Sequence, residues 1–138
     1  MADAKKPIPV PNEDSMEYWA GCREGRLMLQ QCEACGHVRF YPRILCTACG
    51  KTDTRWIQAS GKGTVYTYTV VHRAPSAAFK EDVPYVLALV ELDEGPRMMT
   101  NLVDTGDRKL EIGMPVSVVF EKMSDEISVP KFKPAGEP

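Results

Sequence analysis

The sequence predicts a mainly β protein, in which a short N-terminal helix precedes a four-cysteine metal-binding ribbon and a five-stranded closed barrel. Two paired-cysteine motifs in the first half predict the ribbon. Runs of β-branched and aromatic residues, separated by Gly and Pro turns, predict the barrel in the second half. A helix-like pattern lies before residue 25. We therefore divide the chain into an arm and helix at 1–26, a ribbon at 27–57 and a barrel at 58–138.

The length and charge of the chain argue against several classes of protein. Its 138 residues and 15.4 kDa suit one domain or two very small ones. The net charge of −2 argues against a protein whose main role is to grip nucleic-acid phosphates. No apolar run reaches the roughly 18 residues of a membrane helix, and residues 1–11 lack the apolar stretch of a secretory signal. We therefore expect a cytoplasmic protein with reduced thiols.

The paired cysteines form two motifs of the same form, Cys-x-x-Cys-Gly, and ten residues separate the pairs. Two residues between thiolates let one tight turn present both sulfurs to one ion, and glycine supplies the positive φ that such a turn needs. Four thiolates in tetrahedral geometry favour zinc, with iron as the main competitor. Because four thiolates leave no open position for water or substrate, we expect a structural zinc. The predicted ligands are Cys32, Cys35, Cys46 and Cys49.

Other interpretations of these residues are weaker. A redox Cys-x-x-Cys normally occurs once, on a thioredoxin-like unit that the sequence does not show, and disulfides suit a reducing compartment poorly. Cys22 stands apart in the predicted helix, and we expect it to be a small buried hydrophobic residue. His37 follows the first motif, and with four cysteines available we expect it to be solvated or hydrogen-bonded.

The predicted helix runs from about Asp14 to Glu24. Asp14 and Glu17 have the spacing of a capping box, and Gly25 is a candidate for the C-terminal cap. The residues at helical spacing on one face are Met16, Trp19, Ala20 and Arg23. The apolar part of this face must be buried, either on the chain's own domain or on a partner.

Strand patterns cover most of the remaining chain. They are expected near 27–31 and 55–57 in the ribbon, and near 64–72, 85–92, 97–103 and 116–122 in the barrel. Residues from 130 onward are expected to form an edge strand or to be loose. Simple alternation places Tyr66, Tyr68 and Val70 on one face of their strand. A count of about five strands without a long helix predicts an OB-fold barrel, with an open sandwich as the fallback.

Several further segments are distinctive in combination with the cysteine pairs. They are Tyr18-Trp19, Gly25-Arg26-Leu27, Pro42-Arg43, Trp56, Ser60 to Thr69, Pro84-Tyr85, Glu91 to Gly95 and Gly113-Met114-Pro115-Val116. With these segments the chain resembles, over nearly its whole length, the zinc-ribbon/OB-fold family of acyl-CoA-associated proteins. Members of that family are small accessory partners of thiolases and related enzymes.

The resemblance implies a non-catalytic subunit that supports assembly and shapes the acyl-CoA entrance. A thiolase-fold partner would carry the catalytic Cys and His, and hydratase or aldolase partners also occur in the family. The implied reaction is cleavage of a β-ketoacyl-CoA with CoA. Within that family, the favoured likeness is to the subunit of a thiolase that cleaves 2-benzoylsuccinyl-CoA. The alternative likeness is to the accessory component of an acetyltransferase that acts on phloroglucinols. The chain's own two histidines, His37 and His72, form no catalytic constellation that the sequence would assemble.

Contact with acyl-CoA would require particular residue types. The CoA phosphates need cations, and the adenine needs an apolar or aromatic surface. The candidates are Arg43 beside the ribbon, and Arg73, Phe79 and Lys80 in the loop at 73–83. Each of these taken alone is an ordinary surface residue. We prefer the loop because long loops are often functional.

Two other classes of function stay open. Zinc ribbons and OB-folds also bind nucleic acids, and Tyr66 and Tyr68 could stack on bases. The acidic balance and the absence of an Arg/Lys stripe argue against that function, so we expect neither a nucleic-acid nor a membrane partner. The third class is a stand-alone enzyme or a rubredoxin-like electron carrier, which a red, iron-containing protein would favour.

Overall fold

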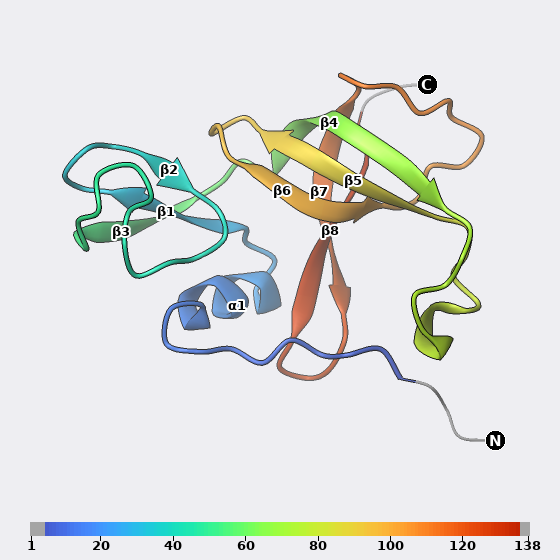
Figure 1. Cartoon of the computed structure of the whole chain (residues 1–138), viewed down its shortest axis with the longest axis horizontal. Coiled ribbons are helices and arrows are strands. Elements are labelled where there is room, and N and C mark those ends of the chain that lie inside the picture. Colours follow the sequence, from blue (N-terminus) through green and yellow to red (C-terminus); the bar gives the residue numbers. More distant parts are fainter. Residues whose placement is uncertain (1–4, 136–138) are drawn as a thin grey trace.

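The computed structural model describes residues 5–135 and confirms the predicted fold class (Figure 1). Helix α1 (Met16–Arg23) is followed by a three-stranded antiparallel sheet in the order β2-β1-β3. Its strands are β1 (Met28–Cys32), β2 (Val38–Arg39) and β3 (Thr54–Gln58). A barrel then closes in the order β4-β5-β6-β8-β7. Its elements are β4 (Lys62–Val71), the 3₁₀ turn η1 (Ala77–Phe79), β5 (Tyr85–Leu92), β6 (Arg97–Leu102), β7 (Pro115–Lys122) and β8 (Ser128–Pro134).

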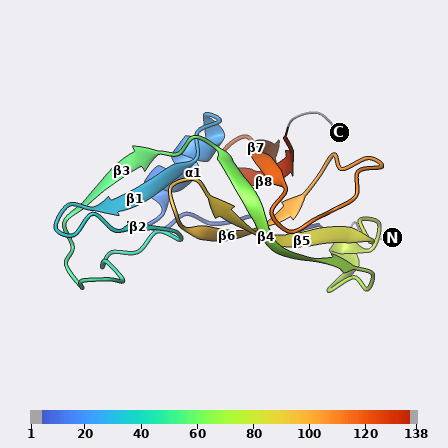
Figure 2. The ribbon, with the colours of Figure 1, turned by 90° about the horizontal axis from the view of Figure 1, so that it is seen from above.

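Helix α1 joins the ribbon to the barrel. The helix contacts β1 on one side and β7 and β8 on the other. Figures 1 and 2 show the ribbon sheet and the barrel side by side. Side chains from all three parts, each no more than 2% exposed, belong to one continuous cluster. Examples are Tyr18 and Cys22 of the helix, Leu29 of the ribbon, and Val90 and Phe132 of the barrel. This shared, close-packed core fixes the ribbon relative to the barrel.

The two ends of α1 differ in how well the sequence predicts them. The capping box of Asp14 and Glu17 does not form, because Ser15 is the N-cap. The backbone N–H and the hydroxyl of Ser15 each donate to Asn12 Oδ1 at 3.0 Å, a local turn that replaces the expected cap. At the other end Gly25 has a φ of +78°, and its N–H bonds back to a helix carbonyl at 3.1 Å. The glycine cap is therefore confirmed.

The buried face of α1 is rotated from the predicted one. Met16 is 59% exposed, whereas the buried helix residues are Tyr18, Trp19, Gly21 and Cys22. The reason is that the chain turns back onto Gly21. The backbone N–H of Arg26 donates to Gly21 O at 2.8 Å, and a Cβ on Gly21 would lie 2.5 Å from Met28 Cγ. The helix packs on the chain's own core, which was one of the two predicted alternatives.

The C-terminal strand is an integral part of the barrel. Strand β8 pairs with β7 at seven positions, from Val116 opposite Pro134 to Lys122 opposite Ser128. Phe132 in β8 has no exposed surface. Burial of this one side chain, together with the pairing to β7, explains why the segment is not loose, and its pairing with β6 is confined to Leu102 and Phe132. The last three residues covered by this prediction, 136–138, lie outside the described residues. No helix among residues 5–135 is long and apolar enough to cross a membrane.

A bulge in β4 separates the two tyrosines that simple alternation places together. The pairing of β4 with β5 shifts between Val65 and Thr67, so Tyr66 is an extra residue. Tyr68 consequently packs against the core, and its hydroxyl donates to Leu110 O at 3.0 Å. Tyr66 is 44% exposed. The prediction of one shared tyrosine face is wrong.

Candidate metal centre and adjoining cleft

The two cysteine motifs fold into matching turns. The backbone N–H of Gly36 donates to Cys32 O at 2.8 Å, and that of Gly50 donates to Cys46 O at 2.9 Å. These glycines have φ angles of +81° and +78°. Glycine adopts that left-handed conformation without steric cost, so the expected reason for a glycine after each motif is confirmed.

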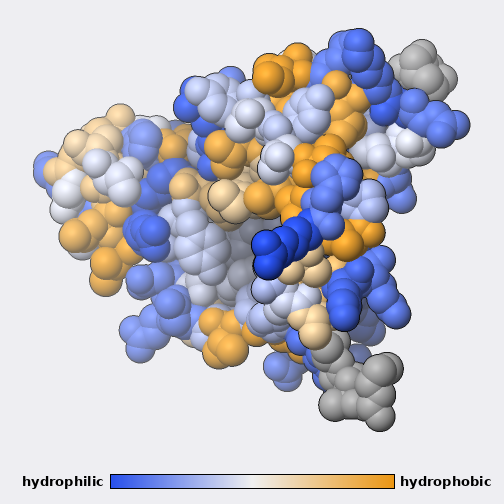
Figure 3. Space-filling view, turned by 45° about the vertical axis from the view of Figure 1, so that its right-hand side comes forward, coloured by the Kyte–Doolittle hydropathy of each residue, from blue (hydrophilic) through white to orange (hydrophobic). Residues whose placement is uncertain are grey.

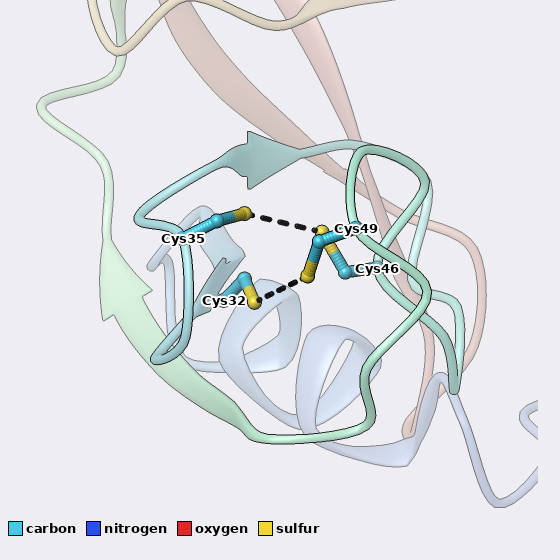
Figure 4. A group of neighbouring side chains, drawn as sticks. All are labelled: Cys32, Cys35, Cys46 and Cys49. Atoms are coloured by element: carbon cyan, nitrogen blue, oxygen red, sulfur yellow. Dashed lines mark hydrogen bonds between the residues drawn. The ribbon is translucent and has the colours of Figure 1, made fainter.

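The four cysteine sulfurs meet in one cluster (Figure 4). All four lie within 4.8 Å of one another, and the pairs Cys32–Cys49 and Cys35–Cys46 are each 3.6 Å apart. Tetrahedral zinc with Zn–S bonds of about 2.3 Å separates its sulfurs by about 3.8 Å, so the cluster fits that ion. None of the five described cysteines is in a disulfide. Four sulfurs complete a tetrahedral shell, which leaves no position for a substrate.

Backbone hydrogen bonds favour the thiolate form in each turn. Backbone N–H groups of the same turn lower the pKa of Cys46 to about 6, and they also lower the pKa of Cys32. At Cys35 the N–H of His37 acts in the same direction, but burial and the neighbouring cysteines outweigh it and raise the pKa to about 11. Each turn therefore presents one readily formed thiolate, and zinc binding must displace the proton of Cys35.

Buried polar residues that sequence reasoning missed hold the segments on either side of the second turn against the sheet. Arg39 is only 3% exposed, and its Nη2 donates to Thr54 Oγ1 at 2.7 Å and to Arg43 O at 2.9 Å. Gln30, which pairs with Arg39 across β1 and β2, accepts from the Arg43 N–H at 2.8 Å. No local pattern marks the side-chain partners, because Thr54 lies 15 residues from Arg39 and Gln30 lies 13 residues from Arg43.

Two further residues, His37 and Cys22, have the environments expected of them. His37 is exposed, with Nε2 3.3 Å from Thr47 Oγ1, which confirms a hydrogen-bonding role. Cys22 is 1% exposed, and burial raises the pKa of its thiol to about 11. Neither belongs to the four-sulfur cluster.

A cleft of about 630 Å³ opens where α1, the N-terminal arm, η1 and the barrel meet, and the molecule is hollowed on this face (Figure 3). Its aromatic lining residues are Tyr18, Trp19, Phe40, Tyr41, Phe79 and Tyr85. Two ion pairs also line it: Lys6 with Asp82 at 2.5 Å, and Lys131 with Glu121 at 3.2 Å. Apolar walls with a few polar groups are typical of binding sites. The sequence did not predict this cleft, because residues far apart in the chain form it.

The four residues expected to contact CoA do not converge. Phe79 lines the cleft, with its ring 6.2 Å from that of Tyr85 and the Lys6 ammonium 5.6 Å from its centroid. Arg73 and Lys80 are exposed and lie outside the cleft lining. Arg43 is exposed on the ribbon, where its backbone, rather than its side chain, makes the contacts described above.

The tyrosines proposed to stack on bases offer little free surface. The Arg97 guanidinium lies 3.8 Å from the centroid of the Tyr66 ring and covers one face of it. Tyr68 is tied to Leu110 and packed against the core. An exposed pair of aromatic platforms, which single-strand binding modules use, is therefore absent from β4.

Comparison with known proteins places the chain in a family. Residues 19–55 match the model of the ChsH2 rubredoxin-like zinc ribbon domain, and residues 56–121 match the model of the ChsH2 C-terminal OB-fold domain. The chain belongs to the ChsH2 (DUF35) family. The resemblance inferred from the sequence is thereby confirmed, together with the zinc ribbon and the OB-fold.

Relatives of this ChsH2-family chain are named as a hydratase subunit, a scaffold protein and an aldolase. A probable enoyl-CoA hydratase alpha subunit of Thermomonospora curvata is 42% identical over 96% of the chain, which spans 41% of that protein's length. A DUF35 domain-containing scaffold protein of Methanocaldococcus jannaschii is 43% identical over 70% of the chain and 68% of its own length. The solved structure of an Ltp2-ChsH2(DUF35) aldolase contains a chain that is 41% identical. It superposes with a TM-score of 0.80 and covers 91% of this chain and 98% of its own.

Proposed function

We propose that this chain is a zinc-stabilised, non-catalytic subunit of an acyl-CoA-processing enzyme. The observation that carries the proposal is the closed four-sulfur cluster on a ribbon that shares its core with the barrel. Such a centre stabilises a rigid surface and has no open metal position for chemistry. The names of the relatives (scaffold protein, hydratase alpha subunit and aldolase) support a partner that processes acyl-CoA.

The proposed zinc ligands are Cys32, Cys35, Cys46 and Cys49. When bound, zinc cross-links the two turns and supplies folding free energy to a ribbon of only three short strands. The chain's own residues complete the support: Arg39 and Gln30 fasten Thr54 and Arg43, which flank the second turn, to the sheet. Free thiols suit a reducing compartment, so the cytoplasm stays the predicted location. The division at residues 26 and 57 likewise stays a prediction.

The finer assignment is a thiolase-fold partner that carries the catalytic residues and cleaves a β-ketoacyl-CoA with CoA. The family resemblance supports this choice, and 2-benzoylsuccinyl-CoA is the substrate we favour. In this assignment the chain binds the partner and shapes the path of the acyl-CoA, while no residue of the chain takes part in bond making or breaking.

For contact with CoA we propose the loop between β4 and β5, where Arg73 and Lys80 are exposed cations and Phe79 supplies an aromatic surface. Arg43 is a separate, more distant candidate. Charge reversal by Arg73→Glu or Lys80→Glu should raise the KM of the complex for acyl-CoA without preventing assembly. Arg43→Glu tests the ribbon in the same assay. An unchanged KM in all three variants would remove these residues from the path of CoA.

Gentle co-purification of the tagged chain from its host, with zinc quantified in the same sample, tests the proposed function. The expected result is one zinc per chain and a near-stoichiometric acyl-CoA-processing enzyme, whose identity then gives the substrate. A thiolase-fold partner would support the finer assignment, and a hydratase or aldolase would replace it. Nucleic acid in place of an enzyme, or the zinc-loaded chain alone, would contradict the proposal.

A further inference from the structure

The barrel has an open seam between β6 and β8. Within residues 5–135 these strands pair at one position, Leu102 with Phe132, whereas β7 and β8 pair at seven. Both strands run in the same direction through that junction. The residues that precede it, Met98 to Asn101 on β6 and Val129 to Lys131 on β8, have no ladder pairing with each other, and they line the cleft. One side-chain bond crosses between them, from the Thr100 hydroxyl to Pro130 O at 3.2 Å, so the seam is open ahead of Thr100, at Arg97 to Met99. Figure 1 shows the β7–β8 hairpin leaving the sheet of β4, β5 and β6 toward α1.

The unpaired backbone groups on β6 can be assigned from two hydrogen bonds. Pro96 O accepts from the Leu92 N–H at 2.9 Å, so residue 96 faces β5, while the Val103 N–H donates to Phe132 O at 2.8 Å and faces β8. Because backbone groups alternate along a strand, Met98 and Thr100 bond toward β5. The N–H and C=O of Met99, and those of Arg97, therefore point to the open seam. Met99 is also 64% exposed, in an otherwise well-paired barrel.

An exposed strand edge is a template for pairing with another extended chain. The charged residues that line this cleft, Lys6, Asp82, Glu121 and Lys131, already form ion pairs with each other. The remaining lining is dominated by aromatic residues and methionines. The chemistry of the site is thus backbone hydrogen bonding beside apolar side-chain pockets, which fits an extended peptide with uncharged side chains.

We infer that an extended segment of the partner subunit adds as a short strand to the edge of β6 at Arg97 to Met99, ahead of the Thr100–Pro130 hydrogen bond, with its alternate apolar side chains in the aromatic cleft. This inference rests on the proposed function, because it assigns a docking mode to the proposed partner. A second copy of the chain fits poorly, since α1, the arm and η1 surround the edge and a strand within another barrel cannot enter between them. A terminal or loop segment of a few residues can.

Hydrogen exchange of single amides tests the docking mode in the isolated chain and in the complex co-purified from the host. The Met99 amide should exchange freely in the isolated chain and at least tenfold more slowly in the complex. The amides of Met98 and Thr100, bonded to β5, should be protected in both states and serve as internal controls. A Met99 amide that is equally protected in the isolated chain, or equally free in the complex, would overturn the inference.

Substitution at the same position gives an independent readout. Met99→Pro removes the seam-facing N–H without breaking a bond to β5, and proline is tolerated on strand edges. Met99→Ala removes the side chain and keeps the N–H. The proline variant should bind the purified partner about fivefold more weakly than the alanine variant, with both variants melting within a few degrees of each other. Equal affinities of the two folded variants would contradict strand addition.

The results separate this inference from the proposed function. Failure of any acyl-CoA enzyme to co-purify overturns both. An assembled complex in which Met99 stays unprotected overturns only the strand addition. The isolated chain could instead dimerise as its concentration rises, with the Met99 amide protected in the dimer. That result would assign the edge of β6 to a second copy of the chain and would also overturn the strand addition by a partner segment.

Discussion

Replacing Cys46 by serine removes one of the four sulfurs, and Cys22→Ser is its matched control. Structural zinc sites in zinc-finger peptides bind with roughly 10–16 kcal/mol at neutral pH, so one of four ligands contributes on the order of 3 kcal/mol. The four sulfurs already lie within 4.8 Å of one another and fill the tetrahedral shell. The remaining cysteine, Cys22, is buried in the core and cannot replace the lost sulfur. We therefore expect the zinc affinity of Cys46→Ser to fall by about a hundredfold or more.

Competition for zinc with a chromogenic chelator measures this loss. Cys46→Ser should release zinc at a much lower chelator concentration than the unmodified chain, and should unfold at a lower temperature. Cys22→Ser should keep its zinc affinity within about twofold. It should lose about 1–2 kcal/mol of stability, because a hydroxyl replaces a thiol in the core. A Cys46→Ser chain that binds zinc and its partner as the unmodified chain does would refute the structural role of the centre.

Three further substitutions or treatments probe the core and the ribbon. Gly63→Ala places a Cβ 2.5 Å from Glu91 O, so β4 must move. The free energy of unfolding, measured by urea titration, should therefore fall by about 2–3 kcal/mol, and an unchanged urea midpoint would contradict the close approach. Arg39→Met removes the hydrogen bonds to Arg43 and Thr54, on either side of the second turn, and should cost about 2 kcal/mol in the same titration, with zinc released more readily by chelators. The thiol of Cys22, with its pKa raised to about 11, should resist iodoacetamide at pH 8 in the folded, zinc-loaded chain, as located by peptide mass spectrometry. It carries little thiolate below that pKa, so its labelling should rise with pH or on unfolding, and rapid labelling at Cys22 itself at pH 8 would refute its burial.

The metal centre was predictable because its geometry is local. The spacing of Cys32 and Cys35, with Gly36 after them, determines a turn through hydrogen bonds within five residues. Repeating that turn at the second motif specifies four ligands without knowledge of the rest of the fold. The strand patterns of the barrel are local in the same sense, because alternation and turn residues mark them directly.

Features that depend on distant contacts were not predictable from the sequence. The buried face of α1 depends on the chain returning to Gly21, and the separation of Tyr66 from Tyr68 depends on a bulge against β5. The role of Arg39 depends on Thr54, which lies 15 residues away. The cleft combines the arm, the helix, the segment that follows β2 and four segments of the barrel half, so no window of the sequence contains it.

The candidate CoA contacts show the same limit. Arg73, Phe79 and Lys80 are neighbours in the sequence, yet only Phe79 faces the cleft, because η1 turns the segment between β4 and β5. Residue types suited to CoA can be recognised in a loop, whereas their convergence depends on the path of the backbone. A partner surface could complete such a site, which the KM variants test.

Reconstitution of activity tests the central claim most directly. The purified partner enzyme, the zinc-loaded chain and the two together are assayed with the acyl-CoA substrate that the partner's identity indicates. The account predicts no turnover by the chain alone, and turnover by the reassembled complex that exceeds the turnover of the partner alone. Turnover by the chain alone, or a partner that is equally active without it, would contradict the assignment of a non-catalytic subunit of an acyl-CoA-processing enzyme.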